Sequence, residues 1–443
     1  MVSSQRSREE EGVKKVAVFG LGFVGLPLAL SFAIRGCEVY GVDVNADLIA
    51  ELNEGITHHL EHYHNTPIQK VLKDQLEAGR FKATTDAADA LANCNNIIMT
   101  VGIPVVNGEH LFDHVESAAR AIGKGLKPND LVLVRSTLVP GMTQNYIRPI
   151  LEKESGLKAD DDFYLAYSSE RIAEGKAFEE FENMPTLVSG VDRASRDRAM
   201  ELLGIVTKAD LVPCSSIEVV ETAKVMENVS RDVDIAMVNE FARFTKALGV
   251  DTFEVIRVAN THKRVKLLLP GPGVGGYCIP NALHYLTPKA EEMEVPLPLL
   301  RLARDINEHV PQFVVSMVTR NLPVLAKEAK VAVFGIAMKD FSNDDRLSPA
   351  LQVIELLQTT GIKVAAFDPA VPTRHSFKVD SLQEALEGAH GIVVLAKQDG
   401  IDYNNFSLFK KYLSAAGQPF IVDTRNVYER KVVEAGGFIL ETL

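Results

Sequence analysis

The sequence predicts an α/β protein in which two doubly wound parallel-sheet domains are joined by an all-helical segment. Short apolar runs alternate with helix-like segments toward both ends of the chain, a pattern typical of parallel sheets covered by helices. The six residues Lys15–Gly20 recur letter for letter as Lys330–Gly335, which favours a second domain of the same kind. The repeat alone is also compatible with two unrelated strand-helix units that begin alike. Between these regions the apolar residues recur with a helical period.

Length and composition restrict the class of protein. A chain of 443 residues suits two or three domains. Its net charge of −12 argues against nucleic acid as the main partner. No apolar run is long enough to span a membrane, and the polar start of the chain lacks the apolar core of a signal peptide. The four cysteines are widely spaced, without a CxxC pair or a Cys/His cluster, so we expect reduced thiols in a cytoplasmic protein and no metal site.

The same patterns place the domain boundaries. We expect a disordered polar tail over residues 1–13 and a first sheet domain over residues 14–212. The helical segment covers residues 213–322, and the second sheet domain covers residues 323–443.

A glycine motif marks the start of the first domain. The apolar run Lys15–Phe19 leads directly into a GxGxxG sequence at Gly20, Gly22 and Gly25, and a helix-like segment follows. These glycines permit a tight turn, and the helix N-terminus accepts a pyrophosphate. Asp43 ends the next predicted strand, where a carboxylate accepts hydrogen bonds from a ribose diol and repels a 2′-phosphate. We therefore interpret this region as a Rossmann-like domain that binds NAD rather than NADP, in preference to a simple glycine-rich turn.

Polar residues follow the next predicted strands. Thr137 comes shortly after the strand Leu131–Val134, and Glu170 shortly after the strand Phe163–Tyr167. Ligands of open parallel sheets lie beyond the carboxyl ends of the strands, so both residues are candidates for a site. Taken singly, each is better explained as a helix cap or a solvated loop residue.

The helical segment opens with a long helix. Ser215–Glu218 forms a plausible capping box, and the helical pattern continues to about Leu248. Glu221, Lys224 and Asn228 share one face of this helix. Lys224 lies among apolar residues and is a candidate for a fixed positive charge. A surface ion pair between Glu221 and Lys224 explains the same spacing, and the spacing does not choose between the two.

A loop rich in glycine and proline, Leu269–Pro280, surrounds Cys278. Glycine permits positive φ and the close approach of a ligand, and proline restricts the backbone. We expect a shaped loop that presents the thiol to a small molecule. The alternative is a surface loop with an inert cysteine, which describes most free cysteines.

The second sheet domain lacks the glycine motif of the first. After Lys330–Gly335, strands are predicted at Lys363–Phe367, Gly391–Leu395 and Phe420–Asp423. We expect a second Rossmann-like domain with a different ligand.

Taken together, these features resemble the UDP-glucose/GDP-mannose dehydrogenase family over nearly the whole chain, from about Lys14 onward. The turn Ala259–Val265 and the loop Pro270–Gly276 are more similar to the UDP-N-acetylhexosamine branch, whose substrates are UDP-GlcNAc and UDP-ManNAc, than to the UDP-glucose branch. The motifs that carry the resemblance are the GxGxxG at Gly20–Gly25, Ser136-Thr137 with Pro140-Gly141, Ser169–Gly175, Lys224–Asn228, Gly271–Cys278, Lys339 with Asp344, Arg346, Ser348 and Pro349, and Asp423–Asn426.

The resemblance implies two successive oxidations of the sugar C6 alcohol to a carboxylate with two NAD, for polysaccharide or glycan precursor synthesis. Cys278 is then the nucleophile that forms a thiohemiacetal and a thioester, Lys224 and Asn228 hold the C6 oxyanion, and Thr137 and Glu170 position and activate water. The implied partner is a second copy of the chain, in a homodimer or higher homo-oligomer built on the helical segment, with Arg264 reaching the partner's substrate. The implied NAD-binding residues are Gly20, Gly22, Phe23, Val24, Gly25, Asp43, Thr137 and Glu174. The implied binding residues for the UDP-sugar are Glu170, Arg171, Ile172, Lys224, Asn228, Arg264, Gly275, Tyr277, Lys339 and Arg425.

The sequence departs from the family pattern at two positions. Tyr277 stands where this branch often has His, and Ala282 stands where the family usually has an Asp that supports water activation. We therefore expect Glu170 to carry thioester hydrolysis alone and this step to be slow. Three alternatives remain at this point: a UDP-glucose 6-dehydrogenase, a catalytically impaired nucleotide-sugar-binding relative, and a two-electron β-hydroxyacid dehydrogenase. The last needs neither Cys278 nor the second sheet domain.

Overall fold

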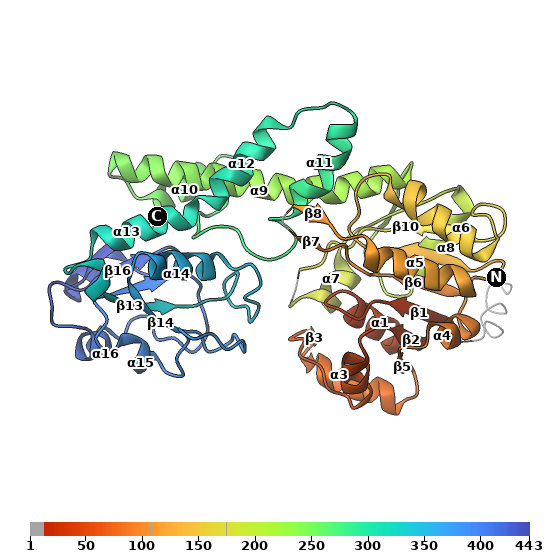
Figure 1. Cartoon of the computed structure of the whole chain (residues 1–443), viewed down its shortest axis with the longest axis horizontal. Helices are drawn as coiled ribbons and strands as arrows, with labels where there is room; N and C mark the ends of the chain where they lie inside the picture. Colours follow the sequence, from red (N-terminus) through yellow and green to blue (C-terminus); the bar gives the residue numbers. More distant parts are fainter. Residues whose placement is uncertain (1–12, 107, 174) are drawn as a thin grey trace, which may run out of the picture. The chain divides into compact units, whose positions relative to one another are not determined.

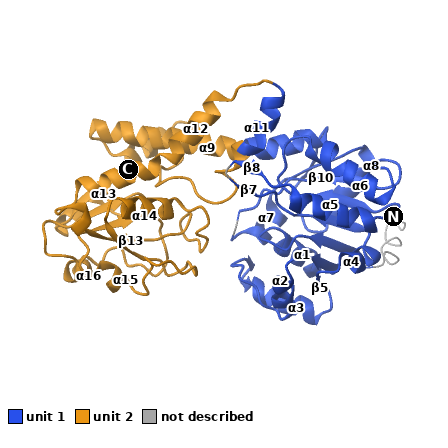
Figure 2. Cartoon of the chain, in the orientation of Figure 1, with its two compact units in different colours: residues 1–226, 284–293 blue, residues 227–283, 294–443 orange. Residues whose placement is uncertain are grey.

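The computed structural model describes residues 13–106, 108–173 and 175–443 (Figure 1). The chain divides into two compact units, one of residues 1–226 with 284–293 and the other of residues 227–283 with 294–443 (Figure 2). Except for Val13, the predicted tail lies outside the described residues, as does Glu174.

The first unit is built on a sheet of eight strands in the order β12-β11-β10-β9-β6-β1-β2-β5. All neighbours are parallel except β10 and β11, which are antiparallel. Six neighbouring strands of this sheet, β10-β9-β6-β1-β2-β5, have the order of a dinucleotide-binding sheet. The strands are β1 (Lys15–Phe19), β2 (Glu38–Val42), β5 (Phe81–Thr84), β6 (Asn96–Met99), β9 (Leu131–Val134), β10 (Tyr164–Tyr167), β11 (Thr186–Gly190) and β12 (Leu211–Pro213).

Helices cover the sheet of the first unit and exclude water from its core. Val16 and Val18 of β1 are fully buried, and they belong to the same apolar core as Leu26 and Phe32 of the first helix. The helices are α1 (Gly25–Ile34), α2 (Ala46–Asn53), α3 (Ile68–Glu77), α4 (Ala87–Asn93), α5 (Asp113–Gly125), α6 (Arg148–Ser155), α7 (Ala177–Asn183), α8 (Arg193–Leu203) and the π-helix η1 (Thr143–Ile147). Two short hairpins, β3 (His62–Tyr63) with β4 (Thr66–Pro67) and β7 (Val105–Val106) with β8 (Glu109–His110), complete the unit.

The predicted long helix is α9 (Ile217–Leu248), and the hydroxyl of Ser216 accepts a hydrogen bond from the N–H of Val219 at its start. Gly249 ends it with a φ of +77°. The other helices of this segment are α10 (Thr252–Ala259), α11 (Ala282–Glu292), α12 (Pro298–Glu308) and α13 (Val310–Arg320). They are shared between the two units, because the boundary between the units falls within α9 and most of α11 groups with the first unit. Within the described ranges, no helix has the length and apolar character that a membrane span requires.

The second unit contains a parallel sheet of five strands in the order β14-β13-β15-β16-β17. This is the other common order of doubly wound sheets, with a switch point between β13 and β15. The strands are β13 (Lys330–Phe334), β14 (Lys363–Phe367), β15 (Gly391–Val394), β16 (Phe420–Asp423) and β17 (Ile439–Thr442). The helices are α14 (Pro349–Thr359), α15 (Leu382–Leu386), α16 (Phe406–Tyr412), α17 (Arg430–Ala435) and the short 3₁₀ turn η2 (Ala326–Glu328).

One buried carboxylate fixes the first turns of α9 to the sheet domain of the first unit. Glu221 is fully buried, and its carboxylate accepts hydrogen bonds from the N–H of Gly141 at 2.6 Å and from the N–H and hydroxyl of Thr143 at 3.0 and 2.6 Å. Neither a surface ion pair with Lys224 nor a role in the site is needed to explain Glu221. It instead satisfies donors at the start of η1.

We expect Glu221→Gln to lower the free energy of unfolding by about 1–3 kcal/mol, because it turns an amide toward N–H donors.

The contribution of Glu221 to stability should also depend on pH. Burial raises the pKa of Glu221, and this effect outweighs the hydrogen bonds from Thr143 and Gly141, which lower it. Between the ordinary carboxyl pKa and the raised one, the folded protein therefore binds more protons than the unfolded chain, and the stability supplied by this group falls as pH rises. Urea unfolding of wild type and Glu221→Gln over that range should show a wild-type advantage that shrinks with rising pH. An advantage that grows with pH would contradict this prediction.

Candidate active site

The glycine turn after β1 has the geometry that a dinucleotide requires. Gly20 has a φ of +91°, and a Cβ at Gly25 would lie 1.7 Å from the carbonyl oxygen of Gly20. The hydroxyl of Thr100, which follows β6, lies 2.8 Å from the same carbonyl oxygen. Both glycines are therefore required by the protein's own packing. A Cβ at Gly22 would meet no atom within 4 Å, so the space above Gly22 is open to a ligand.

Asp43 connects this turn to the end of β2. Its carboxylate accepts hydrogen bonds from the N–H of Leu21 at 2.8 Å and from the N–H of Asn45 at 3.0 Å, and the side chain is only partly buried. A carboxylate has room for about two further hydrogen bonds. Phe23, in the turn, is 43% exposed, and its ring centroid lies 5.1 Å from that of His59. The open space at Gly22 and the free acceptor sites of Asp43 fit a dinucleotide with an unmodified ribose.

The second sheet domain repeats this connection with a different result. Asp368, after β14, accepts hydrogen bonds from the N–H groups of Ile336 and Ala337 at 2.8 and 3.2 Å. It also accepts two from Ala370 and Val371 and one from the amide of Gln398. Asp368 is 2% exposed, so its carboxylate is saturated and closed to a ribose. The sequence repeat is therefore structural, and the second domain has lost the dinucleotide acceptor.

Glu170 lies beyond β10 and is held from three directions. Its carboxylate forms a buried ion pair with Arg135. It also accepts hydrogen bonds from the N–H groups of Arg171 at 2.7 Å and Ile172 at 2.9 Å. These contacts leave roughly one lone-pair site on the carboxylate. Glu170 is thus fixed in place, which suits holding one water or one substrate hydroxyl.

Arg135 orients Glu170, although no motif in the sequence marks it. Arg135 follows β9 and is 4% exposed, and its guanidinium carbon lies 5.8 Å from the ring centroid of Phe181. Its Nε and the hydroxyls of Ser168 and Ser169 are buried without a hydrogen-bond partner among the described residues. An arginine directly after an apolar strand was the available signal, since such a residue is rarely buried unless it is paired.

Thr137 lies in the loop after β9, and its surroundings are fixed by a buried tyrosine. The hydroxyl of Tyr167 donates a hydrogen bond of 2.9 Å to the carbonyl oxygen of Ser136. Thr137 itself is partly exposed. The loop therefore presents Thr137 at the carboxyl edge of the sheet that also carries Glu170 and the glycine turn.

Lys224 and Asn228 lie one turn apart along α9, and both are buried, at 8% and 7% exposure. Neither side chain forms a hydrogen bond or an ion pair with another described residue, and neither polar group is among the buried polar atoms that lack a partner, so each keeps contact with solvent. An ammonium and an amide that a helix holds in place and leaves open are available to a ligand. This arrangement favours the functional interpretation of Lys224 over the surface pair.

The loop that carries Cys278 runs against the second sheet domain. A Cβ at Gly275 would lie 2.6 Å from Cδ of Pro349 and 3.0 Å from the carbonyl oxygen of Leu347. A Cβ at Gly276, whose φ is +80°, would lie 2.6 Å from Sδ of Met338. The glycines are therefore needed for close approach to the protein itself. Cys278 follows two residues after Gly276 and is exposed.

The residues after Cys278 bear on the missing Asp. Ala282 begins α11 and is 2% exposed, so a longer side chain there would enter a packed region. Asn281 donates a hydrogen bond of 2.9 Å from its amide to the carbonyl oxygen of Tyr277. Asn281 thus has a structural role that the loop needs.

Arg425 and Lys339 lie at the carboxyl edge of the second sheet. Arg425 forms a two-point ion pair with Asp340, with Nε and Nη2 each 2.8 Å from a carboxylate oxygen. The buried carboxylate of Asp423 holds the loop through the N–H groups of Arg425, Val427 and Tyr428. Lys339 is exposed beside Asp340. Fixed cations at a switch point suit a diphosphate.

Arg264 lies at the tip of a closed turn. The amide of Asn260 donates a hydrogen bond of 2.9 Å to the carbonyl oxygen of Leu267 and accepts one of 2.7 Å from the N–H of Leu267. These two bonds close the turn at its base, and Arg264 is exposed between them.

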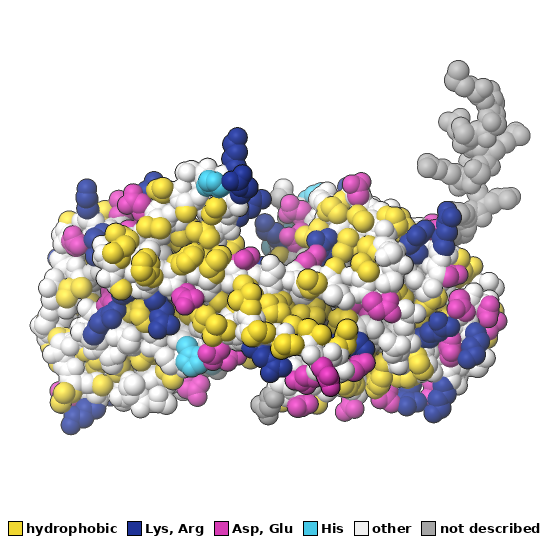
Figure 3. All heavy atoms as spheres, turned by 90° about the horizontal axis from the view of Figure 1, so that it is seen from above, with side chains coloured by type: hydrophobic (Ala, Val, Ile, Leu, Met, Phe, Trp, Pro, Cys, Tyr) yellow, Lys and Arg dark blue, Asp and Glu magenta, His cyan; other side chains and the backbone are white. Residues whose placement is uncertain are grey.

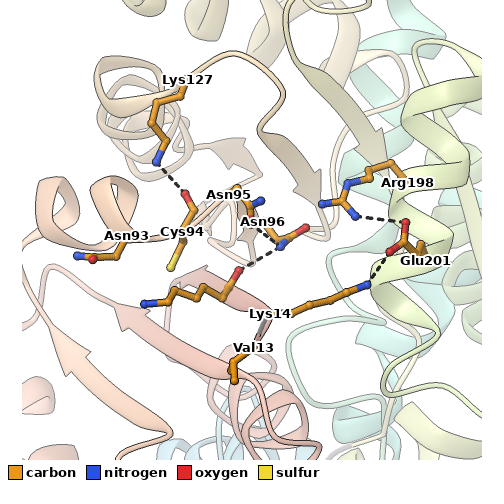
Figure 4. A pocket seen from close by; sticks show the side chains of 10 residues that line it. Val13, Lys14, Asn93, Cys94, Asn95, Asn96, Lys127, Arg198 and Glu201 are labelled. Atoms are coloured by element: carbon orange, nitrogen blue, oxygen red, sulfur yellow. Dashed lines mark hydrogen bonds and ion pairs between the residues drawn. The ribbon is translucent and has the colours of Figure 1, made fainter. Parts of the chain in front are cut away.

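A hollow of about 470 Å³ lies elsewhere, at the amino-terminal edge of the eight-stranded sheet (Figure 4). Lys14 and Arg198 in this hollow are both paired with Glu201, and Lys127 donates to carbonyl oxygens at the end of α4. The cations are thus neutralised by the protein, and the hollow is at the opposite edge from the glycine turn. We do not assign it to the candidate site.

The structure groups the predicted site residues by unit. The glycine turn, Asp43, Thr137, Glu170 with its neighbours Arg171 and Ile172, and Lys224 belong to the first unit. Asn228, Arg264, Gly275, Tyr277, Cys278, Lys339 and Arg425 belong to the second. The dinucleotide features thus lie together in one unit, and the thiol loop lies with the anion-binding edge in the other.

Three family models cover most of the chain. They are the NAD binding domain (residues 14–207), the central domain (218–309) and the UDP binding domain (332–430) of the UDP-glucose/GDP-mannose dehydrogenase family.

Known proteins resemble the chain over nearly its full length. The UDP-N-acetyl-D-mannosamine dehydrogenase of Pyrococcus horikoshii is 34% identical over 96% of this chain and 98% of its own. The UDP-N-acetyl-D-glucosamine 6-dehydrogenase of Pseudomonas aeruginosa is 33% identical over 86% of this chain and 90% of its own. A solved structure of UDP-D-ManNAc dehydrogenase from P. horikoshii superposes with a TM-score of 0.88, with 33% identity over 97% of this chain and 98% of that one.

Asp43 should enforce the choice of NAD. We expect Asp43→Ala to lower kcat/KM for NAD by about 10- to 100-fold, because a charged hydrogen bond to the ribose is lost, and to raise the relative use of NADP. Initial rates with both dinucleotides measure this change. Asp43→Asn is the control, since it keeps an acceptor for the N–H of Leu21 and removes only the charge. A wild-type protein that prefers NADP would contradict the assignment.

Proposed function

Because this chain belongs to the UDP-glucose/GDP-mannose dehydrogenase family, we propose that it oxidises the C6 alcohol of a UDP-N-acetylhexosamine to the uronic acid through a covalent intermediate on Cys278. The observation that supports this proposal most strongly is the exposed Cys278, which lies two residues after glycines that pack against the domain matched by the UDP-binding model. The choice of an N-acetylhexosamine rests on relatives 30–34% identical that are named UDP-N-acetyl-D-mannosamine dehydrogenases. The product serves as a precursor for polysaccharide or glycan synthesis in the cytoplasm.

The reaction has four chemical steps. The C6 hydroxyl loses its proton and C6 loses a hydride, which gives an aldehyde. The Cys278 thiolate adds to the aldehyde carbon and forms a thiohemiacetal. This adduct loses a proton and a second hydride, which gives a thioester. Water attacks the thioester, breaks the C–S bond and releases the carboxylate and the thiol. NAD, when bound at the glycine turn, supplies the acceptor for each hydride.

The residues of the chain supply charge and position for these steps. The ammonium of Lys224 favours the thiolate form of Cys278 and, with the amide of Asn228, stabilises the oxyanion that develops at C6. Thr137 and Glu170 hold the water. The single acceptor site left on Glu170 accepts a hydrogen bond from that water, so one proton of the water points toward the carboxylate. Lys339 and Arg425 bind the diphosphate, Gly275 and Tyr277 line the sugar, and Arg171 and Ile172 support Glu170.

We expect two NADH for each sugar acid, because both oxidations occur before product leaves. UDP-ManNAc, UDP-GlcNAc, UDP-GalNAc and UDP-glucose should be compared by absorbance, with the acid quantified by mass spectrometry. Cys278→Ser should abolish formation of the acid, because a hydroxyl is a poor nucleophile without a strong base. Cys214→Ser is the matched control, since Cys214 lies at the end of the eight-stranded sheet and is not part of the proposed site.

With Ala282 in place of a carboxylate, hydrolysis should limit turnover. A burst of about two NADH per active site should then precede the steady rate, with an acyl adduct on Cys278 in quenched protein. One NADH per product, or full turnover to the acid by Cys278→Ser, would refute the covalent mechanism. UDP-glucose as the best substrate would refute only the choice of sugar.

We further propose that a second copy of the chain completes the site. Met237, Phe241, Phe244 and Leu248 are 37–66% exposed at helical spacing along α9. Val258 of α10 and Leu302 of α12 are 59% and 57% exposed. Figure 3 views the molecule from above, where these helices lie in Figure 1, and shows hydrophobic side chains gathered on that face. A stripe of this kind is typical of helical packing between subunits, and it supports a homodimer in which Arg264 acts on the partner's substrate.

Mixing two inactive variants tests whether Arg264 acts between subunits. Arg264→Ala and Cys278→Ser should each be strongly impaired. When the two are denatured and refolded together, or co-expressed, about a quarter of all sites should combine an intact Arg264 with an intact Cys278 from different chains. Recovery to about that fraction of wild-type activity is expected. Absence of recovery in verified mixed dimers, or a fully active monomer in gel filtration, would rule out action between subunits.

A further inference from the structure

We infer that Asn239 of α9 is a positioning residue for the Cys278 loop. The amide oxygen of Asn239 accepts a hydrogen bond of 3.1 Å from the N–H of Gly271, near the beginning of the loop. Both residues are buried, with Asn239 4% exposed. This inference rests on the proposed function, because it assigns Asn239 to the placement of the proposed nucleophile.

The amide of Asn239 is held in one orientation by further buried groups. Its nitrogen donates a hydrogen bond of 3.0 Å to the amide oxygen of Asn307 on α12. The nitrogen of Asn307 donates in turn to the carboxylate and the carbonyl oxygen of Asp232, both at 2.8 Å. Arg304 donates to the same carboxylate at 3.0 Å. The chain of donors therefore has one direction, from the N–H of Gly271 to the carboxylate of Asp232.

This direction determines what Asn239 can offer the loop. Asp232 carries acceptors only, so it fixes the nitrogen of Asn307 toward itself and the oxygen of Asn307 toward Asn239. Asn239 must then present its nitrogen to Asn307 and its oxygen to Gly271. A buried N–H is costly to leave unpaired, so the backbone of Gly271 is bound to this one acceptor. The network joins α9, α12 and the loop into one fixed body.

The loop is constrained on the opposite side as well. A Cβ at Gly271 would lie 2.6 Å from Nη1 of Arg425, so the guanidinium borders the loop backbone directly. Arg425 is itself held by Asp340. Gly271 therefore lies between the amide of Asn239 and the guanidinium of Arg425. With Gly275 and Gly276 packed against Pro349 and Met338, contacts at both ends of the glycine stretch determine where Cys278 lies.

Loss of the Asn239 contact should change the chemistry more than substrate binding. The Arg425–Asp340 ion pair does not involve Asn239, so the diphosphate contacts stay in place. Gly275 and Tyr277, which line the sugar in the proposed function, move with the loop, so KM should change, but only a little compared with kcat. Displacement of the thiol should lower kcat, because errors of about 1 Å in a reacting group reduce rates by up to about 100-fold. A general loss of stability would lower Tm but would leave kcat and KM unchanged at temperatures where the protein is still folded.

The experiment uses the full chain with two variants of Asn239 and one control. Asn239→Ala removes the acceptor. Asn239→Asp keeps an acceptor for Gly271 but loses the donor to Asn307, and it serves if Asn239→Ala does not fold. Thr245→Val is the matched control, because Thr245 lies on α9 like Asn239, and the change removes its buried 2.6 Å hydrogen bond to Thr252 at the start of α10. The measurements are kcat, KM, Tm and the rate of alkylation of Cys278 by iodoacetamide, followed by peptide mass spectrometry.

We expect Asn239→Ala to lower kcat by about 10- to 100-fold with little change in KM, and to change the alkylation rate of Cys278 by several-fold. Asn239→Asp should lie between Asn239→Ala and wild type, and Thr245→Val should match wild type in both rates despite a lower Tm. Unchanged kcat and alkylation in Asn239→Ala, or equal changes in Thr245→Val, would overturn the inference. The alkylation rate separates this outcome from a failure of the covalent mechanism, because it reports the thiol's surroundings whether or not Cys278 is the nucleophile.

Discussion

The close approach of the Cys278 loop to the second sheet domain is the constraint on which the rest of this unit depends. Side chains at Gly275 and Gly276 would collide with Pro349 and Met338, and a side chain at Gly271 would collide with Arg425. A loop that must lie flat on another surface needs glycine at each contact, and its proline residues then limit the conformations left to it. The exposed thiol is thus held in the same unit as Lys339 and Arg425, which is why the proposal pairs a nucleophile at Cys278 with a diphosphate at these cations.

The two sheet domains show how one sequence pattern serves two purposes. In each, an Asp after the second strand of the domain accepts a hydrogen bond from the N–H that follows the first glycine, Leu21 in one case and Ile336 in the other. Asp43 keeps acceptor sites open to solvent, whereas Asp368 uses its own on four N–H groups and Gln398. The identical letters at Lys15–Gly20 and Lys330–Gly335 therefore preserve a way of closing the turn, and the difference in burial decides which domain accepts a ribose.

The sequence predicted α9 and the most apolar strands of both sheets, because each ends at a glycine or a polar residue, but it did not predict the short edge strands β5, β12 and β17. Phe420–Asp423 and Leu131–Val134 were predicted to the residue. It did not reveal β11, which is antiparallel to β10, since pairing direction depends on partners remote in the chain. Nor did it reveal Arg135 or Asn239, whose roles come from a single contact with a loop far away in sequence. Motif residues can be recognised from spacing, but the residues that hold them require coordinates.

Some polar side chains of the candidate site form several hydrogen bonds within the protein, and others form none with described residues. Glu170, Arg425 and Asp423 each have several hydrogen bonds within the protein, so their positions are fixed before any ligand arrives. Lys224 and Asn228 are buried without such partners among the described residues, and Cys278 is exposed. The polar groups of Lys224 and Asn228 thus stay open to a ligand while their helix is held, because Glu221 fastens the first turns of α9 to the sheet domain of the first unit. Electrostatic stabilisation of an oxyanion requires donors that are oriented but unoccupied, and the proposed mechanism assigns that task to these two side chains for this reason.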